Sequence, residues 1–265
     1  YVSFLDHTLD SMAGDLWVYI RGRPPQSFSS AGPLTGDAKS TEARSAPDGR
    51  MRIANRQGVL YAESSFSRCT VDIAHPAAGG PPVFTGRPWL MLALWGYLSY
   101  RNGALMHGAV AHVAGRQVML LGDKGAGKST LSELVVQAGC GCLSDEHSFL
   151  TNTAGVAWAH GTPWSWVGNP DMPKSAPASA IFFLRHAPRN EVRRLSVAEA
   201  GERLLRNCRF FPYDPSTIPK TIDVLDAAAR TVPIFDFGFV PTLEAVKVLE
   251  DVLEGLPAPA AGSET

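Results

Sequence analysis

The chain has 265 residues and a formal net charge of −1, and 45% of its residues are hydrophobic while 18% are charged. This composition supplies enough apolar side chains for a sizeable core, which excludes a wholly disordered chain, and the balanced charge excludes a simple polycation for nucleic acid. No apolar run reaches the roughly 18 residues that a membrane span needs. We therefore expect neither a nucleic-acid partner nor a membrane association.

The cysteines and the first residues indicate the cellular setting. Four cysteines without a C-x-x-C pair are too few for a disulfide scaffold and lack the spacing of a zinc site. Residues 1–10 mix Asp and His with apolar side chains and do not resemble a signal peptide. We expect a cytoplasmic protein.

Residues 1–86 have the composition of short strands and loops. The apolar run at 14–21 predicts a first strand, whereas the Pro-, Ser- and Gly-rich stretch at 22–50 predicts a flexible loop. Three strand-like runs follow within 51–73, and the Gly-Gly-Pro-Pro of 79–82 ends them. We therefore expect a smaller β-rich N-terminal part.

Residues 87–255 alternate between helical and strand-like segments. Helical spacing predicts helices over 87–101, 128–138, 197–207, 221–230 and 241–254, the third of them behind a capping box formed by Ser196 and Glu199. Apolar runs predict strands at 105–113, 117–122, 142–150, 155–160, 180–185 and 232–237. The alternation predicts an α/β core, and the Ala- and Pro-rich residues 256–265 predict a disordered tail.

One motif carries specific chemistry. The sequence Gly-Asp-Lys-Gly-Ala-Gly-Lys-Ser over 122–129 matches G-x-x-x-x-G-K-[ST] and stands between an apolar strand and a helical segment. Its glycines allow backbone N–H groups to surround phosphate oxygens, Lys128 neutralises β/γ-phosphate charge, and Ser129 ligates Mg²⁺. We expect ATP and Mg²⁺ as cofactors and these nucleotide-binding residues: Gly122, Asp123, Lys124, Gly125, Ala126, Gly127, Lys128, Ser129 and Thr130.

Two absent motifs narrow the class of nucleotide-binding protein. An N-K-x-D motif for reading guanine is absent, which disfavours a GTPase. An L-S-G-G-Q signature is also absent, because the nearest string, LSVAEAG, lacks its glycine pair. A transport ATPase of the ABC type is therefore disfavoured.

An acid pair and a histidine accompany the glycine-rich motif. Asp145 and Glu146 follow Lys128 by enough chain for a helix, a turn and a strand, which places them at the phosphate end of the fold. One acid there can hold Mg²⁺ and the other can accept a proton from an attacking hydroxyl. His107, on the strand before the motif, can hydrogen-bond Asp145 and tune its pKa.

These three features together resemble the catalytic domain of HPr kinase/phosphorylase, a bacterial P-loop serine kinase. The likeness rests on His107-Gly108, on Gly122 to Ser129 and on Asp145-Glu146, in that order, although the family usually has a second Asp where Glu146 stands. The resemblance implies a P-loop kinase core of HPr-kinase type with Asp145 as general base, assisted by His107. It also implies that Glu146, Ser129 and Asp145 serve the metal, and that the chain forms a homo-oligomer.

The second half is similar to HPr-kinase-like proteins of ribosomal peptide maturation systems, including lasso peptide kinases. The string from His160 to Trp164 and the stretch 181–200 carry this likeness, which implies phosphorylation of a precursor-peptide serine. Hydrogen-bonding and aromatic residues in this half are candidates for the acceptor site, with a Trp-filled core turn as the alternative for the first three: His160, Thr162, Trp164, Arg185 and Arg189.

We therefore expect a kinase that transfers the γ-phosphate of ATP to a serine hydroxyl of a peptide or protein partner. A small-molecule acceptor such as free serine is one alternative, and a regulatory module that binds nucleotide without turnover is another. The acid pair favours catalysis over the regulatory module, because a pure binding module needs no general base.

Overall fold

The computed structural model describes residues 16–23, 41–55, 58–74, 82–144, 146–162 and 175–257. The described chain forms two compact units that divide between Tyr100 and Arg101. We expected the division at residue 86. The helix that follows residue 86 instead belongs to the first unit, because it covers a sheet of that unit.

The first unit is a five-stranded sheet in the order β1-β5-β4-β3-β2 with one long helix. Its elements are β1 (Trp17–Arg23), β2 (Glu42–Ser45), β3 (Met51–Asn55), β4 (Gly58–Ala62), β5 (Arg68–Ala74) and α2 (Pro82–Ser99). Strand β1 pairs with β5 in parallel and the other pairs are antiparallel. The helix contacts β1, β4 and β5, and Trp89 reaches the backbone at Gly58.

Two expectations for this unit are wrong in detail. Strand β2 lies within the stretch predicted as a flexible loop, and its side chains are mostly exposed, so no alternation of apolar and polar residues signals it. Helix α2 begins at Pro82 and not at 87, with Pro82 in its first position, where a missing N–H costs nothing. The rest of the expected loop, residues 24–40, and residues 1–15 lie outside the described residues.

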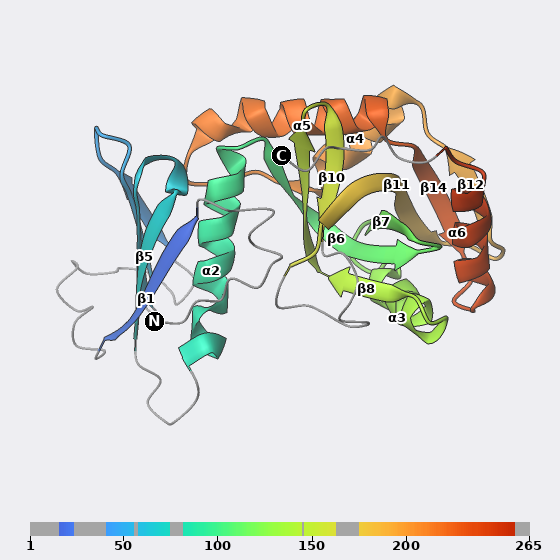
Figure 1. The fold of residues 1–265 in the computed structure, drawn as a ribbon, viewed down its shortest axis with the longest axis horizontal. Coiled ribbons are helices and arrows are strands. Elements are labelled where there is room, and N and C mark those ends of the chain that lie inside the picture. The colour runs from blue at the N-terminus through green and yellow to red at the C-terminus, as the bar shows by residue number, and fades with distance from the viewer. Residues whose placement is uncertain are drawn as a thin grey trace. The chain divides into compact units, whose positions relative to one another are not determined.

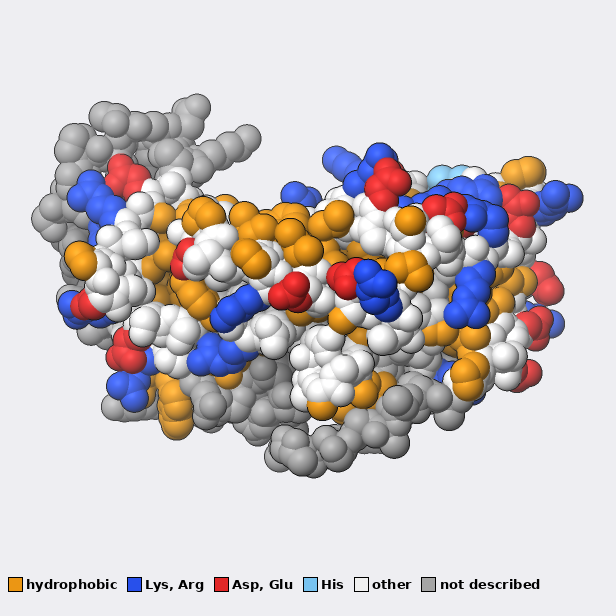
Figure 2. Space-filling view, turned by 90° about the horizontal axis from the view of Figure 1, so that it is seen from above, with side chains coloured by type: hydrophobic (Ala, Val, Ile, Leu, Met, Phe, Trp, Pro, Cys, Tyr) orange, Lys and Arg blue, Asp and Glu red, His pale blue; other side chains and the backbone are white. Residues whose placement is uncertain are grey.

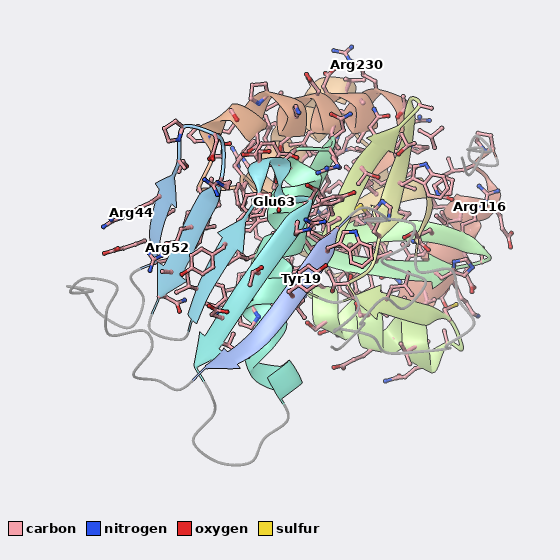
Figure 3. The ribbon with its side chains drawn as sticks, turned by 60° about the vertical axis from the view of Figure 1, so that its left-hand side comes forward. Tyr19, Arg44, Arg52, Glu63, Arg116 and Arg230 are labelled. Atoms are coloured by element: carbon pink, nitrogen blue, oxygen red, sulfur yellow. The ribbon has the colours of Figure 1, made fainter. Side chains whose placement is uncertain are left out.

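One face of this sheet carries a row of side chains that crosses all five strands. Tyr19 is opposite Thr70, Thr70 opposite Tyr61, Tyr61 opposite Arg52, and Arg52 opposite Arg44. Directly opposed residues point to the same face of a sheet. Figure 3 labels Tyr19, Arg52 and Arg44 of this row.

The second unit is built on a sheet with the main order β10-β9-β6-β7-β11-β14-β12. Its strands are β6 (Gly103–Val113), β7 (Arg116–Leu121), β8 (Gly141–Ser144), β9 (His147–Thr153), β10 (Val156–His160), β11 (Ser175–His186), β12 (Glu191–Arg194), β13 (Cys208–Arg209) and β14 (Ile234–Phe239). Strands β7, β11 and β14 are parallel, whereas β6 runs antiparallel to β7.

Four helices cover the two faces of this sheet: α3 (Lys128–Gln137), α4 (Val197–Asn207), α5 (Ile218–Thr231) and α6 (Glu244–Glu254). Figure 1 shows α4 and α5 along one face and α3 and α6 on the other. Met119 of β7 joins a buried cluster with α4 and α5, while its neighbour Leu120 joins one with α3 and α6. The mixed α/β architecture predicted from the alternation of segments is therefore confirmed.

The local predictions for this unit hold unevenly. Ser196 and Glu199 form the predicted capping box at the start of α4. The segment 142–150, predicted as one strand region, is two strands, β8 and β9, that pair with different parts of β6. Helix α6 begins at Glu244 and not at 241, and β12 and β13 were not predicted.

The surface over α4 and α5 carries charges of both signs. Figure 2 looks onto this side of the second unit and shows Lys and Arg interspersed with Asp and Glu. Two of the ion pairs there join residues four positions apart, Arg206 with Glu202 and Arg230 with Asp226. Within the described ranges, no helix is both long enough and apolar enough to cross a membrane.

Candidate functional site

Strand β6 pairs with two successive strands along each of its edges, and on both edges the partner changes near His107 and Gly108. On one side β7 pairs with β6 up to Gly108, and β13 takes over at Met106. On the other side β8 pairs with β6 from Val110 onward, and β9 pairs with it up to His107. The glycine-rich loop, residues 122–129, begins where β7 stops pairing with β6, and Glu146 lies directly before β9 on the other side of β6.

The glycine-rich loop connects β7 directly to α3. Gly125 and Gly127 have φ angles of +84° and +93°, which side chains with a Cβ rarely adopt. A Cβ on Gly127 would also lie 2.6 Å from the ring of Phe239. Helix α3 begins at Lys128, so its positive end faces the loop. The loop therefore needs glycine at these positions for conformation, and at Gly127 for space as well.

Lys128 folds back onto the loop. Its side chain is buried, and Nζ donates hydrogen bonds to the carbonyl oxygens of Gly122 at 2.6 Å and Asp123 at 3.0 Å. Burial lowers the pKa of Lys128, and the nearby Asp123 charge partly offsets this. The ammonium group is thus held at the mouth of the loop, where it can exchange these carbonyls for phosphate oxygens.

Two side chains from other elements hold the loop. Asn207, the last residue of α4, accepts a hydrogen bond from the Gly122 N–H at 3.2 Å. His186, the last residue of β11, donates from Nε2 to the Gly125 carbonyl at 2.8 Å, and its ring stacks on Phe239. Sequence analysis missed both residues, because a lone polar residue at the end of an element carries no spacing signal.

The loop fits an anion. The N–H groups of Gly125, Gly127 and Lys128 have no hydrogen-bond partner among the described residues. Unpaired N–H groups at a helix N-terminus, together with an ammonium group, form a binding site for phosphate. The other loop residues that we expected to bind nucleotide have exposed or half-buried side chains around this site: Asp123, Lys124, Ala126, Ser129 and Thr130.

A magnesium ion fits this site only together with phosphate. Ser129 and Glu146 are both exposed and provide oxygen ligands, but in the described part of the chain no three His, Cys, Asp or Glu side chains form a metal-binding group. Mg²⁺ commonly takes one or two protein ligands and completes its shell with phosphate and water. Asp145, the expected general base, lies outside the described residues.

His107 lies close to both Lys128 of the loop and the backbone of Glu146. Burial is the largest cause that lowers the pKa of His107, and the charges of Lys128, Arg209 and His147 lower it further. A hydrogen bond with the Glu146 backbone raises this pKa. Its ring also makes an edge contact with His147, whose Nδ1 lies 3.7 Å from a Glu146 carboxylate oxygen. His107 is therefore neutral near pH 7, so one ring nitrogen can donate and the other can accept.

His160 and Thr162 do not face an acceptor site, contrary to our expectation. His160 is buried, with Nε2 2.8 Å from the Thr151 hydroxyl and Nδ1 2.8 Å from the Ser175 hydroxyl. Thr162 is also buried and donates to the His147 carbonyl at 3.2 Å. Through these hydrogen bonds both residues support β9, Thr162 at its first residue, His147, and His160 at Thr151. Strand β10 extends to His160, so His160 belongs to the sheet and not to a loop that follows it. Trp164 lies outside the described residues.

Arg185 and Arg189 are engaged in ion pairs. Arg185 binds Asp236 and Glu191, and Arg189 lies 3.4 Å from Glu191. The same Asp236 also binds Arg203, whose guanidinium lies over the ring of Phe183. The Arg185 guanidinium is therefore committed to neighbouring carboxylates, and an incoming phosphate would have to compete with two of them.

The candidate site is thus a glycine-rich loop between a strand and a helix of a mixed α/β fold. No protein-family model matches the chain, and no curated protein matches it. Among solved structures, the chain is similar to the HPr(Ser) kinase/phosphatase from Coxiella burnetii, at 12% identity and a TM-score of 0.36. That match covers 57% of this chain and 88% of the other.

Proposed function

We propose that this protein is an ATP-dependent kinase that transfers the γ-phosphoryl group to a serine hydroxyl of a peptide or protein. The observation that carries the proposal is the convergence at one point of β6 of the glycine-rich loop with Lys128, of His107, and of Glu146 from the acid pair. A nucleotide-binding loop alone does not distinguish a kinase from other nucleotide-binding proteins. Transfer to a hydroxyl is helped by a carboxylate that accepts the hydroxyl proton, and a neighbouring histidine can hold or tune that carboxylate.

We assign the residues the following roles. Lys128 and the loop N–H groups bind the β- and γ-phosphates and hold the γ-phosphorus in line with the acceptor. Ser129 and the acid pair would hold Mg²⁺ together with the phosphates, and the bound ion would supply positive charge to the transferred group. Asp145 accepts the serine proton, and His107, hydrogen-bonded to the backbone at Glu146, holds the residue that follows Asp145 in place.

The transfer is balanced without any further reactant. The serine oxygen forms a bond to the γ-phosphorus while the bond from that phosphorus to the bridging oxygen breaks, and its electron pair leaves with ADP. The proton of the hydroxyl passes to Asp145 and then to solvent. The likeness in sequence to HPr-kinase-like proteins of lasso peptide maturation supports a precursor-peptide serine as the acceptor.

Intact-mass spectrometry tests the proposal. The full chain is incubated with Mg²⁺ and ATP and with three acceptors: a precursor peptide that ends in serine, HPr, and free serine. We expect one added phosphate on the peptide, which is lost in Lys128→Ala and Asp145→Asn. Lys247→Ala, an exposed lysine on α6, is the matched control and keeps the activity.

The other outcomes decide between the alternatives. Phosphate on free serine alone would make the protein a small-molecule kinase. ATP binding without phosphate on any of the three acceptors would replace the kinase with a nucleotide-binding module.

A further inference from the structure

Strand β13 lies where β7 would continue if the glycine-rich loop did not leave the sheet. Strand β7 pairs with β6 up to Gly108, and the two residues of β13 pair with Met106 and Leu105 of the same edge. Asn207, which immediately precedes β13, holds the Gly122 N–H. The segment 207–209 is therefore fixed against the start of the loop by three contacts to two elements.

The pairing register places Arg209 on the loop side of the sheet. Arg209 is opposite Leu105, and opposed residues share a face. Leu105 and His107 also share that face, because side chains alternate along a strand. Two positions further on, Ala109 packs in the same buried cluster as Leu131 of α3. Arg209 and His107 thus lie on the face covered by α3, whose first residue is Lys128.

Arg209 is an uncommitted cation at this position. It is exposed, and it makes no ion pair or side-chain hydrogen bond with any other described residue. It is near enough that its charge, with that of Lys128, contributes to lowering the pKa of His107. The two arginines expected from sequence to meet the phosphate, Arg185 and Arg189, are by contrast paired with carboxylates.

We propose that Arg209 is a catalytic residue of the phosphoryl transfer, whose guanidinium N–H groups bind the equatorial oxygens of the γ-phosphoryl group in the transition state. The role rests on the proposed kinase function. While the acceptor–phosphorus bond forms and the bond to ADP breaks, negative charge accumulates on these oxygens and on the leaving oxygen. A guanidinium offers several N–H donors at fixed geometry and keeps its proton throughout.

The test separates charge stabilisation in the transition state from simple nucleotide binding. ADP and Mg²⁺ with aluminium fluoride imitate the planar phosphoryl group in flight, whereas ADP and Mg²⁺ alone do not. Binding of each is measured by calorimetry for the full-length wild type, Arg209→Gln and Arg206→Gln. Arg206 is an exposed arginine on the last turn of α4, paired with Glu202, and is the matched control.

We expect the affinity of Arg209→Gln for ADP to stay within about threefold of the wild-type affinity. The gain in affinity that aluminium fluoride gives should be at least tenfold smaller in this variant than in the wild type. Its kcat with the accepted peptide falls by about 100-fold with little change in the KM for ATP, in line with the loss of one transition-state donor. Arg206→Gln behaves as the wild type in both measurements. Arg209→Lys recovers part of the loss, because it restores charge without the planar donor geometry.

Two results would overturn the proposal, and they are distinguishable. If Arg209→Gln keeps the full aluminium fluoride effect and the wild-type kcat, Arg209 has no role in transfer while the kinase function stands. If the wild type itself gains no affinity from aluminium fluoride and phosphorylates no acceptor, the kinase function fails and the role of Arg209 fails with it.

Discussion

The side-chain oxygen of Asn207 accepts a hydrogen bond at 3.2 Å from the N–H of Gly122, a residue 85 positions earlier in the chain. Asn207 is the last residue of α4, and Gly122 is the first residue of the glycine-rich loop. The helix and the loop are therefore coupled through one buried contact, and the conformation of the loop depends on an element on the other face of the sheet.

Replacing Asn207 with leucine tests this coupling. The substitution keeps the side-chain size but leaves the Gly122 N–H buried without a partner, which costs about 1–3 kcal/mol of unfolding free energy. We also expect ADP to bind about tenfold more weakly in calorimetry, since the loop loses an anchor.

Asn190→Leu is the matched control for Asn207→Leu. Asn190 accepts a hydrogen bond from the Val240 N–H, which does not belong to the loop. In urea unfolding, the Asn190→Leu variant should lose about as much stability as Asn207→Leu, and it should keep the wild-type affinity for ADP. Equal effects of the two variants on ADP binding would contradict a specific role for Asn207.

Alanine at Gly127 should damage the loop more than alanine at another glycine with positive φ. Gly127 and Gly155 have φ angles of +93° and +82°, so a Cβ at either position costs about 1–2 kcal/mol in backbone strain. Only at Gly127 does the new Cβ also meet the Phe239 ring, whereas Gly155 has open space around it.

Denaturant unfolding and ADP binding distinguish the two alanine variants. We expect Gly127→Ala to unfold at lower denaturant than Gly155→Ala and to bind ADP at least tenfold more weakly. Gly155→Ala should bind ADP as the wild type does. A Gly127→Ala protein with unchanged ADP affinity would show that the loop tolerates the displacement of Phe239.

His160 should make stability sensitive to acid. Burial lowers its pKa to about 3, below the model-peptide value of 6.5. Between these two values the unfolded chain binds a proton that the folded protein does not, so stability falls as the pH drops through this window, by about 1.4 kcal/mol per pH unit. Above pH 6.5 both states are neutral at this residue and its contribution is constant.

Urea unfolding at a series of pH values measures this contribution. His160→Gln should be less stable than the wild type near pH 7, because it disturbs the hydrogen bonds to Thr151 and Ser175. The difference between the two proteins should shrink as the pH falls from 6.5 towards 3. A difference that stays constant over this range would show that His160 accepts a proton in the folded state.

Removing the carboxylate of Asp236 should lower the stability of the fold more than removing an exposed carboxylate. Its side chain is only 9% exposed and binds both Arg185 and Arg203. Burial by itself raises the pKa of Asp236, but the hydrogen bonds from the two arginines outweigh it and hold the pKa below its usual value. Asp236→Asn leaves Arg203 without a counter-charge and Arg185 with Glu191 alone, which we expect to cost about 2–3 kcal/mol because both guanidinium groups are partly exposed to solvent.

Asp226→Asn provides the comparison for Asp236→Asn. Asp226 pairs with Arg230 on the exposed side of α5, where water and salt screen the pair, so its contribution to stability is small. Thermal unfolding of both variants at low and high salt is the measurement. Equal, small shifts would mean that the Asp236 network does not stabilise the fold.

The features that sequence analysis predicted are those with a local physical signal. The glycine-rich loop is recognisable because phosphate binding needs glycine, lysine and serine at fixed spacing within a few residues. The capping box at Ser196 and the mixed α/β alternation are local in the same sense, and both are confirmed.

The features that it missed depend on pairing between distant segments. Strands β2 and β13 are short and contain polar residues such as Glu42 and Arg209. These residues are extended because they pair with a neighbouring strand, and the local sequence does not signal that pairing. His160 was expected to face a substrate because its neighbours are aromatic. Its burial follows from β10 lying between β9 and β11, which no local pattern encodes.

The hydrogen bonds of Arg116, labelled in Figure 3, hold the residues that follow α6 against the start of β7. Its guanidinium donates to the carbonyl oxygens of Leu256 and Pro257, just beyond α6. Arg116 begins β7 and Leu121 ends it at the glycine-rich loop, so Pro257 is held at the other end of β7, roughly 17 Å of strand from that loop. A tag or a fluorescent reporter placed directly after Pro257 would therefore start from the end of β7 opposite the glycine-rich loop, which makes this position the preferred attachment point for binding assays.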